Sequence, residues 1–502
     1  MELAGGGFLR TKNVILNVFF SFGKQIVLAI SGLILPRLLM GKFGSEVNGL
    51  IGSLTQFLSY IMLMEAGIGG VISASLYKPL YEKDMVKVSG IIEAAKQFYK
   101  KIGYISILYI LVLCIIYPRL IHSSFSNAYI VSMILILAMG ILFQYFVSLP
   151  YMSLVKASQK MWVISNATIL STILNLIIVV ILIKLNMSIQ VVKGCSSVIN
   201  LIIPLSIIWY VNKNYDLRKT KPDKNALKQR WNGLGHHLAF FIHTNTDIAV
   251  ITLFMDLEYV SVYMVYKSVL TAVQSLVLPI SESCSAAFGD LLAEGDQNKT
   301  SYNFDRFEFI QSSITTILYT ITIILIIPFV KIYTLGINDA NYIQPTFSII
   351  IIIAEVVYCI RLIYSTVLLS ANLYKETQLH AWLEAIINIV LSVLLVNSYG
   401  LSGIAVGTLC AMIVRGILDC RYLSKKLIKR SVFKSLKIIV INLFVSCLSI
   451  FIVNKIAFSP DNWISLIFMA IIISIIVGGV ALILYIVLCR KYLKDIIKII
   501  KK

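Results

Sequence analysis

Apolar runs of about 20 residues alternate with short polar breaks along the whole 502-residue chain. A run of this length crosses the ~30 Å hydrocarbon core of a bilayer as an α-helix. The pattern predicts fourteen such helices, near 13–39, 46–77, 102–117, 128–153, 161–183, 189–211, 233–255, 259–288, 307–330, 346–371, 378–396, 401–420, 438–457 and 464–489. The fold class we expect is therefore an all-α membrane protein with fourteen transmembrane helices.

A group of residues at the end of the second predicted helix recurs at a constant offset of 212 positions. Ser73, Ala74, Leu80, Glu82, Asp84 and Lys87 return as Ser285, Ala286, Leu292, Glu294, Asp296 and Lys299. A period this long indicates a duplicated helical bundle and not a solenoid. Helices 1–6 and 7–12 are then two copies of one orientation, related by an axis along the membrane normal, and the last two helices have no counterpart.

This duplication predicts the domain organisation. We expect an N-terminal lobe over 1–211, a basic cytoplasmic linker over 212–232, a C-terminal lobe over 233–423, and a last segment over 424–502 that holds two helices and a basic tail.

Composition and charge agree with a membrane protein. The chain is 58% hydrophobic and 14% charged, with a mean hydropathy of +0.88, which is too apolar for a soluble protein of this size. The net charge of +20 concentrates in alternate loops, so it follows the positive-inside rule and does not indicate nucleic-acid binding. This bias predicts that both termini lie in the cytosol.

The sequence contains none of several common catalytic motifs. It has no phosphate-binding loop, no His-Glu-x-x-His and no Gly-x-Ser-x-Gly. Its cysteines are scattered and never form Cys-x-x-Cys, and the longest predicted outer connection is only 331–345. We therefore expect no enzyme activity, no cofactor and no metal site.

Ionisable and amide residues inside predicted helices are the candidate site, because each is costly in lipid and normally faces a cavity or a partner. Spacings of seven place Asn17 with Lys24, and Lys267 with Gln274, on single helix faces. Deep cations on the first two helices of opposite copies favour an anionic substrate such as pyrophosphate. The predicted substrate-binding residues are Lys24, Lys267, Arg361, His236, His243, Asn17 and Gln274.

Three intramembrane carboxylates, Glu65, Asp247 and Glu355, are candidates for coupling transport to an ion. Plainer interpretations remain open for several charged residues. Glu65 could satisfy a neighbouring cation, and Asp247 could close a hydrogen-bonded network with the two histidines. Arg415–Asp419 and His380–Glu384 have the spacing of pairs within one helix.

Short motifs in the first 90 residues resemble the opening of a known family of transporters. They are Lys12-Asn13, Pro36-Arg37, Gly41-Lys42-Phe43-Gly44, Asn48-Gly49-Leu50, Glu65-Ala66-Gly67-Ile68 and Tyr77-Lys78-Pro79-Leu80. The chain resembles the Wzx-type polysaccharide flippases of the multidrug/oligosaccharidyl-lipid/polysaccharide (MOP) exporter superfamily, and the fourteen-helix pattern extends the likeness along its length. The resemblance implies a V-shaped, MATE-like bundle of two lobes. It also implies that the last two helices accommodate a long lipid tail. Related lipid II flippases place cations, mostly arginines, in the helices that here carry Lys24 and Lys267.

We therefore expect a flippase of the bacterial plasma membrane that moves undecaprenyl-pyrophosphate-linked oligosaccharides to the outer leaflet by alternating access, for capsule or another surface polysaccharide. Its partners would be this lipid-linked oligosaccharide, membrane lipids, a polysaccharide polymerase and glycosyltransferases. One alternative is a cation-coupled multidrug exporter of the same fold. Another is a membrane glycosyltransferase or polymerase, although short outer loops weigh against it.

The orientation can be tested with single cysteines introduced into the loops. Cysteines at Lys221, Lys299 and Lys429 should react with an impermeant thiol reagent only from the cytosol, because the basic loops remain inside. Cysteines at Ser124, Asn338 and Asn462 should react only from outside. Labelling of positions 221 and 338 from the same side would contradict both the helix count and the repeat.

Overall fold

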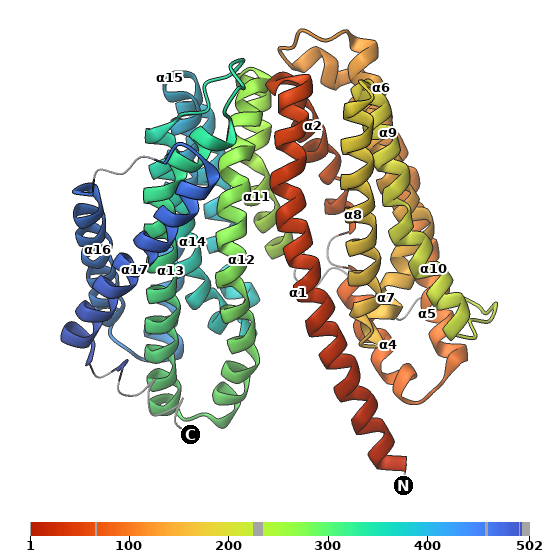
Figure 1. Cartoon of the computed structure of the whole chain (residues 1–502). Coiled ribbons are helices and arrows are strands. Elements are labelled where there is room, and N and C mark those ends of the chain that lie inside the picture. Colours follow the sequence, from red (N-terminus) through yellow and green to blue (C-terminus); the bar gives the residue numbers. More distant parts are fainter. Residues whose placement is uncertain (1, 66–67, 224–233, 457–459, 491, 494–502) are drawn as a thin grey trace. The chain divides into compact units, whose positions relative to one another are not determined.

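The computed structural model describes the whole chain except residues 1, 66–67, 224–233, 457–459, 491 and 494–502. Within the described residues the fold is entirely helical, with no strand (Figure 1). The helices are α1 Glu2–Phe43, α2 Ser45–Ser59, α3 Met62–Glu65, α4 Ile68–Tyr81, α5 Met85–Leu120, α6 Asn127–Phe143, α7 Leu149–Ala157, α8 Met161–Lys184, α9 Ile189–Asn200, α10 Ile202–Asn214, α11 Leu234–Phe254, α12 Leu257–Glu294, α13 Gln297–Tyr333, α14 Pro345–Ser370, α15 Tyr374–Tyr422, α16 Phe433–Asn454 and α17 Trp463–Leu488. Short π-helical turns, η1 Gln144–Ser148 and η3 Leu423–Leu427, follow α6 and α15.

Twelve segments of the described chain are long and apolar enough to cross a membrane. Each of the fourteen predicted segments is largely helical in its described residues, so the predicted fold class is confirmed. The two counts differ mainly because α15 holds two predicted helices in one continuous run, while α11, with its polar Asn, His, Thr and Asp residues, is not among the twelve. The apolar side chains that many of these helices expose are what a lipid-facing surface requires, and the chain is a multi-pass membrane protein.

Several predicted helices contain breaks that the hydrophobic pattern did not reveal. The segment 46–77 is divided into α2, α3 and α4, and the segment 189–211 is divided between α9 and α10. In 128–153 the break is the π-turn η1, which lies before Pro150 at the second position of α7. Breaks of this kind preserve hydropathy, which explains why a window average cannot detect them.

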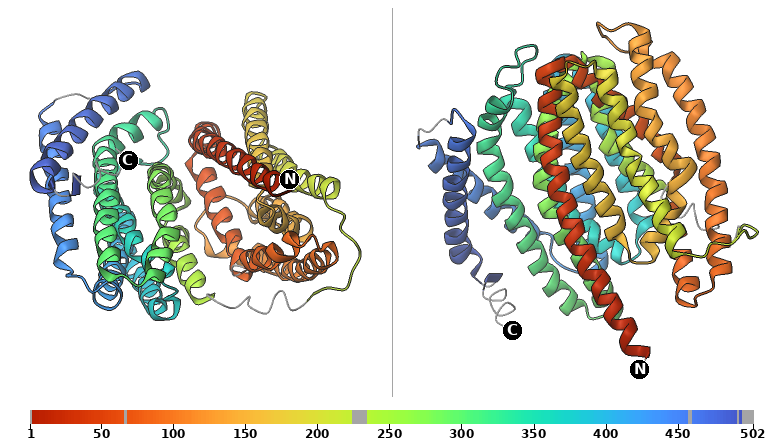
Figure 2. Two further views of the ribbon diagram at one scale, coloured as in Figure 1. Left: turned by 90° about the horizontal axis from the view of Figure 1, so that it is seen from below. Right: turned by 45° about the vertical axis from the view of Figure 1, so that its right-hand side comes forward.

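The chain forms two compact units. Unit 1 consists of residues 1–238 and 256–260, and unit 2 consists of 239–255 and 261–502. In unit 1, α1 lies along α8 (Figure 2). In unit 2, α14 packs on α15 and α13. The domain boundaries expected from the sequence remain a prediction.

The described part of the predicted linker returns to α5. The backbone N–H of Asp223 donates to the Gly90 carbonyl at 3.0 Å, and that of Arg218 donates to Ser89 Oγ at 3.0 Å. A Cβ atom at Gly90 would lie 3.2 Å from the Lys221 carbonyl oxygen. Glycine at this position therefore lets the linker backbone lie directly on the helix. Residues 224–233 of the linker are outside the described part.

The two copies of the repeat have the same local structure where their sequences match. Asp84 caps α5 by accepting from the Lys87 N–H at 3.0 Å, and Asp296 caps α13 by accepting from the Lys299 N–H at 3.0 Å. This backbone hydrogen bond lowers the pKa of Asp84. The residue before each cap has a positive φ, 56° at Lys83 and 75° at Gly295. The recurring sequence therefore encodes the same turn and the same helix start.

The two predicted helices inside α15 fold back on each other at Gly400, whose φ of 54° and ψ of −135° are not helical. Behind this turn the two halves approach very closely. A Cβ atom at Gly407 would lie 2.6 Å from Ser392 Oγ, and one at Gly403 would lie 2.4 Å from the Leu395 carbonyl oxygen. Two glycines thus bring Asn388 on one half to Thr408 on the other, with Asn388 Nδ2 3.1 Å from Thr408 Oγ1.

The last two helices are attached to unit 2 through α13. The Arg430 guanidinium, which is fully buried, lies 2.6 Å from Glu308 and 3.1 Å from Asp305. The next residue of α13, Phe309, packs against Tyr485 of α17, with ring centroids 5.3 Å apart. Buried ion pairs thus hold the segment just before α16 to α13, α16 and α17 pack on α13, and all three helices belong to the same compact unit.

Candidate functional site

Lys267 of α12 is paired with Glu355 of α14. Its Nζ lies 2.5 Å from Glu355 Oε1, and the carboxylate side chain is only 3% exposed whereas the lysine is 38% exposed. Gln274 lies two turns further along α12, and its amide nitrogen is 3.5 Å from the other carboxylate oxygen. Two predicted substrate residues and one predicted coupling residue therefore meet at one point. Lys267 has a negative partner that its sequence position did not reveal.

Arg361 belongs to a second, longer chain of buried charges. Its Nε lies 3.7 Å from Glu384 on the first half of α15, and its guanidinium lies over the Tyr358 ring at 4.9 Å. Glu384 also binds Arg415 on the second half of α15, and Arg415 lies 3.5 Å from Asp419. The Arg415–Asp419 pair predicted from the sequence is confirmed.

His380 completes this chain. Its Nδ1 lies 2.7 Å from Asp419 Oδ1, whereas Glu384, which has the spacing of a pair with His380, binds Arg415. The reason is that α15 folds back at Gly400, which brings the second half of the helix within reach of the first. Two arginines and two carboxylates neutralise one another here, and a buried charge without such partners would be strongly destabilising.

Asp247 of α11 has hydroxyl partners instead of cations. Tyr263 donates to it at 2.8 Å and Thr408 donates at 3.0 Å, while Thr408 accepts from Asn388. Within the described residues no cation lies within ion-pairing distance of Asp247, and Asn388 Oδ1 has no hydrogen-bond partner. The Asp247 cluster, defined as Asp247, Thr408 and Asn388, is buried and rich in oxygen ligands.

Glu65 in unit 1 also has no cation within ion-pairing distance in the described structure. Its carboxylate accepts from Tyr99 at 3.1 Å and lies 3.5 Å from the Tyr145 hydroxyl. These tyrosines come from α5 and η1, so the carboxylate lies where three segments of unit 1 meet. The hydrogen bonds of the Glu65 carboxylate therefore come from tyrosine hydroxyls, and a coupling role for Glu65 remains a prediction.

Asn17 and Lys24 of α1 differ in what they contact. Asn17 accepts from the Trp162 N–H and donates to the Gln159 carbonyl, both at 2.8 Å, so it joins α1 to the start of α8. Lys24 lies two turns further along α1 and is half-buried. It makes no hydrogen bond or ion pair with any residue that the structure describes.

The remaining candidates, His236 and His243, lie on α11. Their side chains are outside the described part of the structure, so their roles remain predictions. Sequence reasoning missed Thr408 and the tyrosines Tyr99 and Tyr263, which are the partners of the carboxylates. A hydroxyl residue in an apolar helix carries too weak a signal to be selected from sequence alone.

The structure is similar to solved structures of membrane transporters. It matches the lipid II flippase MurJ in an inward closed conformation with a TM-score of 0.68 and 17% identity, over 95% of this chain and 100% of that chain. It matches an inward-facing multidrug resistance MATE transporter of the MOP superfamily with a TM-score of 0.64 and 13% identity, over 80% of this chain and 95% of that chain. The MATE multidrug transporter DinF-BH in complex with R6G matches with a TM-score of 0.58 and 17% identity, over 83% and 97% of the two chains.

This chain has the MurJ and MATE fold. Neither the family models nor the curated proteins that were searched include a match to its sequence. Because the sequence identities with MurJ and MATE proteins are low, the likeness establishes the fold, and the residues of this chain must carry any argument about its substrate.

The buried Lys267–Glu355 pair can be tested against an exposed pair of the same length. Lys299 and Glu294 are also 2.5 Å apart, but each is about half exposed. A double-mutant cycle with Lys267→Met and Glu355→Gln should give a coupling energy of roughly 1.5–3 kcal/mol, because the carboxylate is removed from water. The matching cycle with Lys299→Met and Glu294→Gln should give a clearly smaller coupling energy, because water and salt screen an exposed pair. Reversible unfolding in mixed detergent measures both coupling energies. Equal values would contradict the description of Lys267–Glu355 as a buried ion pair.

Proposed function

We propose that this protein is a flippase that moves polyprenyl-pyrophosphate-linked oligosaccharides, with undecaprenyl as the carrier, from the inner to the outer leaflet for surface polysaccharide assembly. The observation that carries the proposal is the extent of the match to MurJ, which covers 95% of this chain and the whole of the flippase. The two MATE matches cover 80% and 83%. The share of this chain that the two MATE matches leave uncovered is similar in size to residues 424–502, which include α16 and α17.

Lys24 supports an anionic substrate. It is a half-buried cation on a membrane-spanning helix, without a partner among the described residues. A lysine in this setting is costly unless an anion or water reaches it. Pyrophosphate is compact and carries enough charge to bind a lysine ammonium strongly. The headgroup would bind Lys24 while the polyprenyl tail stays in lipid.

The two cations of unit 2 that are paired with carboxylates would contribute to headgroup binding less directly than Lys24. Lys267 is largely neutralised by Glu355, and Arg361 is shared with Glu384. An ammonium group has three donors, so Lys267 can bind a phosphate oxygen without leaving Glu355. Arg361 is only 3% exposed and is better suited to holding α14 against α15.

A cation-coupled multidrug exporter is the second candidate, and the MATE matches favour it. A cationic drug would need an acidic site. However, the acids Glu355 and Glu384 are engaged with cations of the protein itself. Asp247 and Glu65, the two carboxylates without a cation among the described residues, are instead held by hydroxyl groups, so the anionic substrate is the better account.

Asp247 is the best placed of the three candidate coupling carboxylates. Glu355 is bound to Lys267, and the Glu65 carboxylate is bound by tyrosine hydroxyls alone, whereas Asp247 has the Thr408 hydroxyl and the Asn388 amide beside it in addition to Tyr263. Hard oxygen ligands of this kind suit a small cation or a proton. We propose that an ion bound here sets the conformational equilibrium that alternating access requires.

The remaining parts of the proposal concern the setting of the protein. The basic loops favour an orientation with both termini in the cytosol of a bacterium. The enzymes that assemble and polymerise the oligosaccharide are then the expected partners, and the protein itself acts as a transporter without catalysis.

Neutralising Lys24 should reduce transport far more than neutralising another lysine of the same helix. Lys42, whose ammonium binds Asn186, provides the matched control. Lys24→Gln removes one charge-assisted contact, worth roughly 1.5–3 kcal/mol, so transport at low substrate should fall about ten- to hundredfold. Lys24→Arg should recover part of it, and Lys42→Gln should transport normally. Translocation of a lipid-linked oligosaccharide in proteoliposomes measures this, and normal transport by Lys24→Gln would contradict the proposal.

Removing the charge of Asp247 should separate coupling from binding. Asp247→Asn should abolish the response of transport to an imposed proton or sodium gradient, while the affinity for the lipid-linked substrate stays within about threefold. Glu65→Gln serves as the comparison and should keep the gradient response. Flux measured at clamped membrane potential, with and without each gradient, tests both variants. A normal gradient response in Asp247→Asn would exclude this residue as the coupling site.

A further inference from the structure

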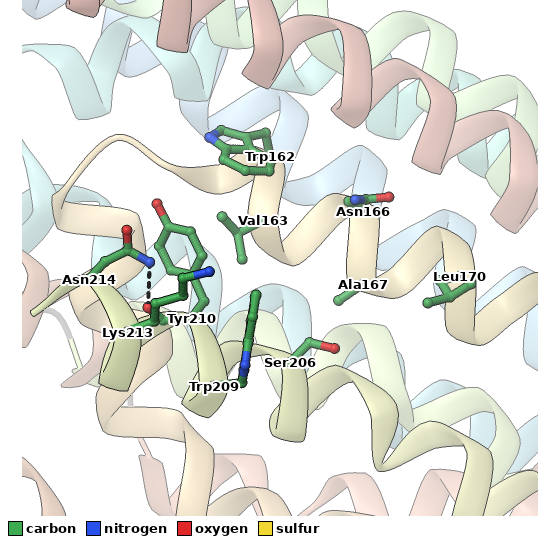
Figure 3. Close-up of a pocket in the computed structure, with 10 residues that line it drawn as sticks. All are labelled: Trp162, Val163, Asn166, Ala167, Leu170, Ser206, Trp209, Tyr210, Lys213 and Asn214. Atoms are coloured by element: carbon green, nitrogen blue, oxygen red, sulfur yellow. Dashed lines mark hydrogen bonds between the residues drawn. The ribbon is translucent and has the colours of Figure 1, made fainter.

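A pocket in unit 1 lies between α8 and α10, away from the charges described above. Its volume is about 410 Å³, and Figure 3 shows its lining. Three aromatic side chains, Trp162, Trp209 and Tyr210, come from the start of α8 and the end of α10. Lys213 and Asn214 lie at the same end as Tyr210, and Leu170 lies toward the other end (Figure 3).

The surroundings of the pocket are those of a surface in contact with lipid. Apolar side chains of α8 and α10 are exposed beside it, including Ile173, Ile177 and Leu205, and Trp209 itself is 64% exposed. Exposed apolar residues on membrane-spanning helices normally face acyl chains, and tryptophan concentrates at the headgroup level. The pocket therefore opens where a helix surface passes from hydrocarbon to headgroup.

Polar groups of the pocket lack partners in the described structure. Asn166 is exposed one turn inside the start of α8, about 7 Å along the axis from Met161. Ser206 lies across the pocket on α10. Neither side chain makes a hydrogen bond to a described residue. On a lipid-facing surface, an amide and a hydroxyl without partners are costly unless a ligand supplies them.

The charge at the aromatic end of the pocket is positive: Lys213 lines the pocket, and Lys160, which is not a lining residue, lies against the lining residue Tyr210. The Lys213 ammonium lies 5.0 Å from the centroid of the Trp209 ring, and the Lys160 ammonium lies 5.5 Å from that of the Tyr210 ring. Neither lysine forms an ion pair with a described carboxylate, and no Asp or Glu lines the pocket. Cation–π contacts hold both ammonium groups at the aromatic end without neutralising them.

We propose that this pocket is a binding site for an anionic glycerophospholipid. The phosphate would bind Lys160 and Lys213, the glycerol and ester oxygens would meet Asn166 and Ser206, and the acyl chains would lie along the exposed apolar side chains beyond Leu170. The two lysines would bind the phosphate, and Asn166 and Ser206, about one turn further into the membrane, would bind the ester oxygens. This order of protein groups matches the order of phosphate, ester and acyl chain in such a lipid. The site is independent of the proposed substrate and would place an annular lipid against the α1–α8 pair of unit 1.

Tryptophan fluorescence provides a direct test, because Trp162 and Trp209 lie in the site. A variant with Trp231→Phe, Trp382→Phe and Trp463→Phe keeps only these two tryptophans. In phosphatidylcholine vesicles, dibrominated phosphatidylglycerol should quench this fluorescence at a concentration at least tenfold lower than dibrominated phosphatidylcholine. Lys160→Gln with Lys213→Gln should remove the difference, since each lysine near the membrane surface contributes roughly fivefold. Lys184→Gln, at the other end of α8, should leave it unchanged.

Three results would overturn the proposal. The first is equal quenching by both brominated lipids, which would mean that the pocket is ordinary lipid-facing surface. The second is a preference for phosphatidylglycerol that survives the double lysine substitution. The third is displacement of phosphatidylglycerol by polyprenyl phosphate at a tenfold lower density, which would make the pocket a site for the carrier lipid. If the tryptophan variant does not fold, native mass spectrometry of the wild-type protein and the lysine variant, counting retained phosphatidylglycerol, decides between the same outcomes.

Discussion

A charge inside the membrane must find a partner, and the described part of unit 2 is organised around this constraint. Transfer of a carboxylate from water into a low-dielectric interior is opposed by several kcal/mol even after relaxation. Glu355 meets Lys267, and Glu384 meets two arginines from different helical segments. These contacts fix α12 against α14, α14 against the first half of α15, and the two halves of α15 against each other, so the same pairs that make the charges tolerable also define the packing.

This constraint also distinguishes the two copies of the repeat. At the offset of 212 residues, Asp247, Glu355 and Glu384 correspond to Leu35, Phe143 and Thr172, none of which is charged. The two copies therefore share helix starts and turns, as the caps at Asp84 and Asp296 show, while the buried charge network of the described residues lies in the second copy. Unit 1 differs in Lys24, a cation within a membrane-spanning helix for which the described residues provide no carboxylate partner.

Much of the fold could be predicted from sequence, because hydrophobic length and the repeat are strong signals. The described residues of all fourteen apolar segments are largely helical, and the recurring Asp84 and Asp296 do start the same helix of each copy. The pairing of buried charges could not be predicted, because it depends on where the chain folds back. His380 and Glu384 have the spacing of a pair, yet the reversal at Gly400 brings Asp419 to His380 and Arg415 to Glu384. The hydrogen bonds of Tyr263 and Thr408 to Asp247 could not be predicted from the sequence either, since hydroxyl residues are common in apolar helices.

The central claim of the account is that Lys24 is the cation that the substrate pyrophosphate neutralises. Equilibrium binding of polyprenyl pyrophosphate, polyprenyl monophosphate and uncharged polyprenol of one chain length, each measured at low and high salt, tests it most directly. The account predicts an affinity that rises with headgroup charge, falls with salt for the two phosphates, and loses at least tenfold of its preference for pyrophosphate over polyprenol in Lys24→Gln. Equal affinity for the three lipids, or an unchanged preference in Lys24→Gln, would contradict it.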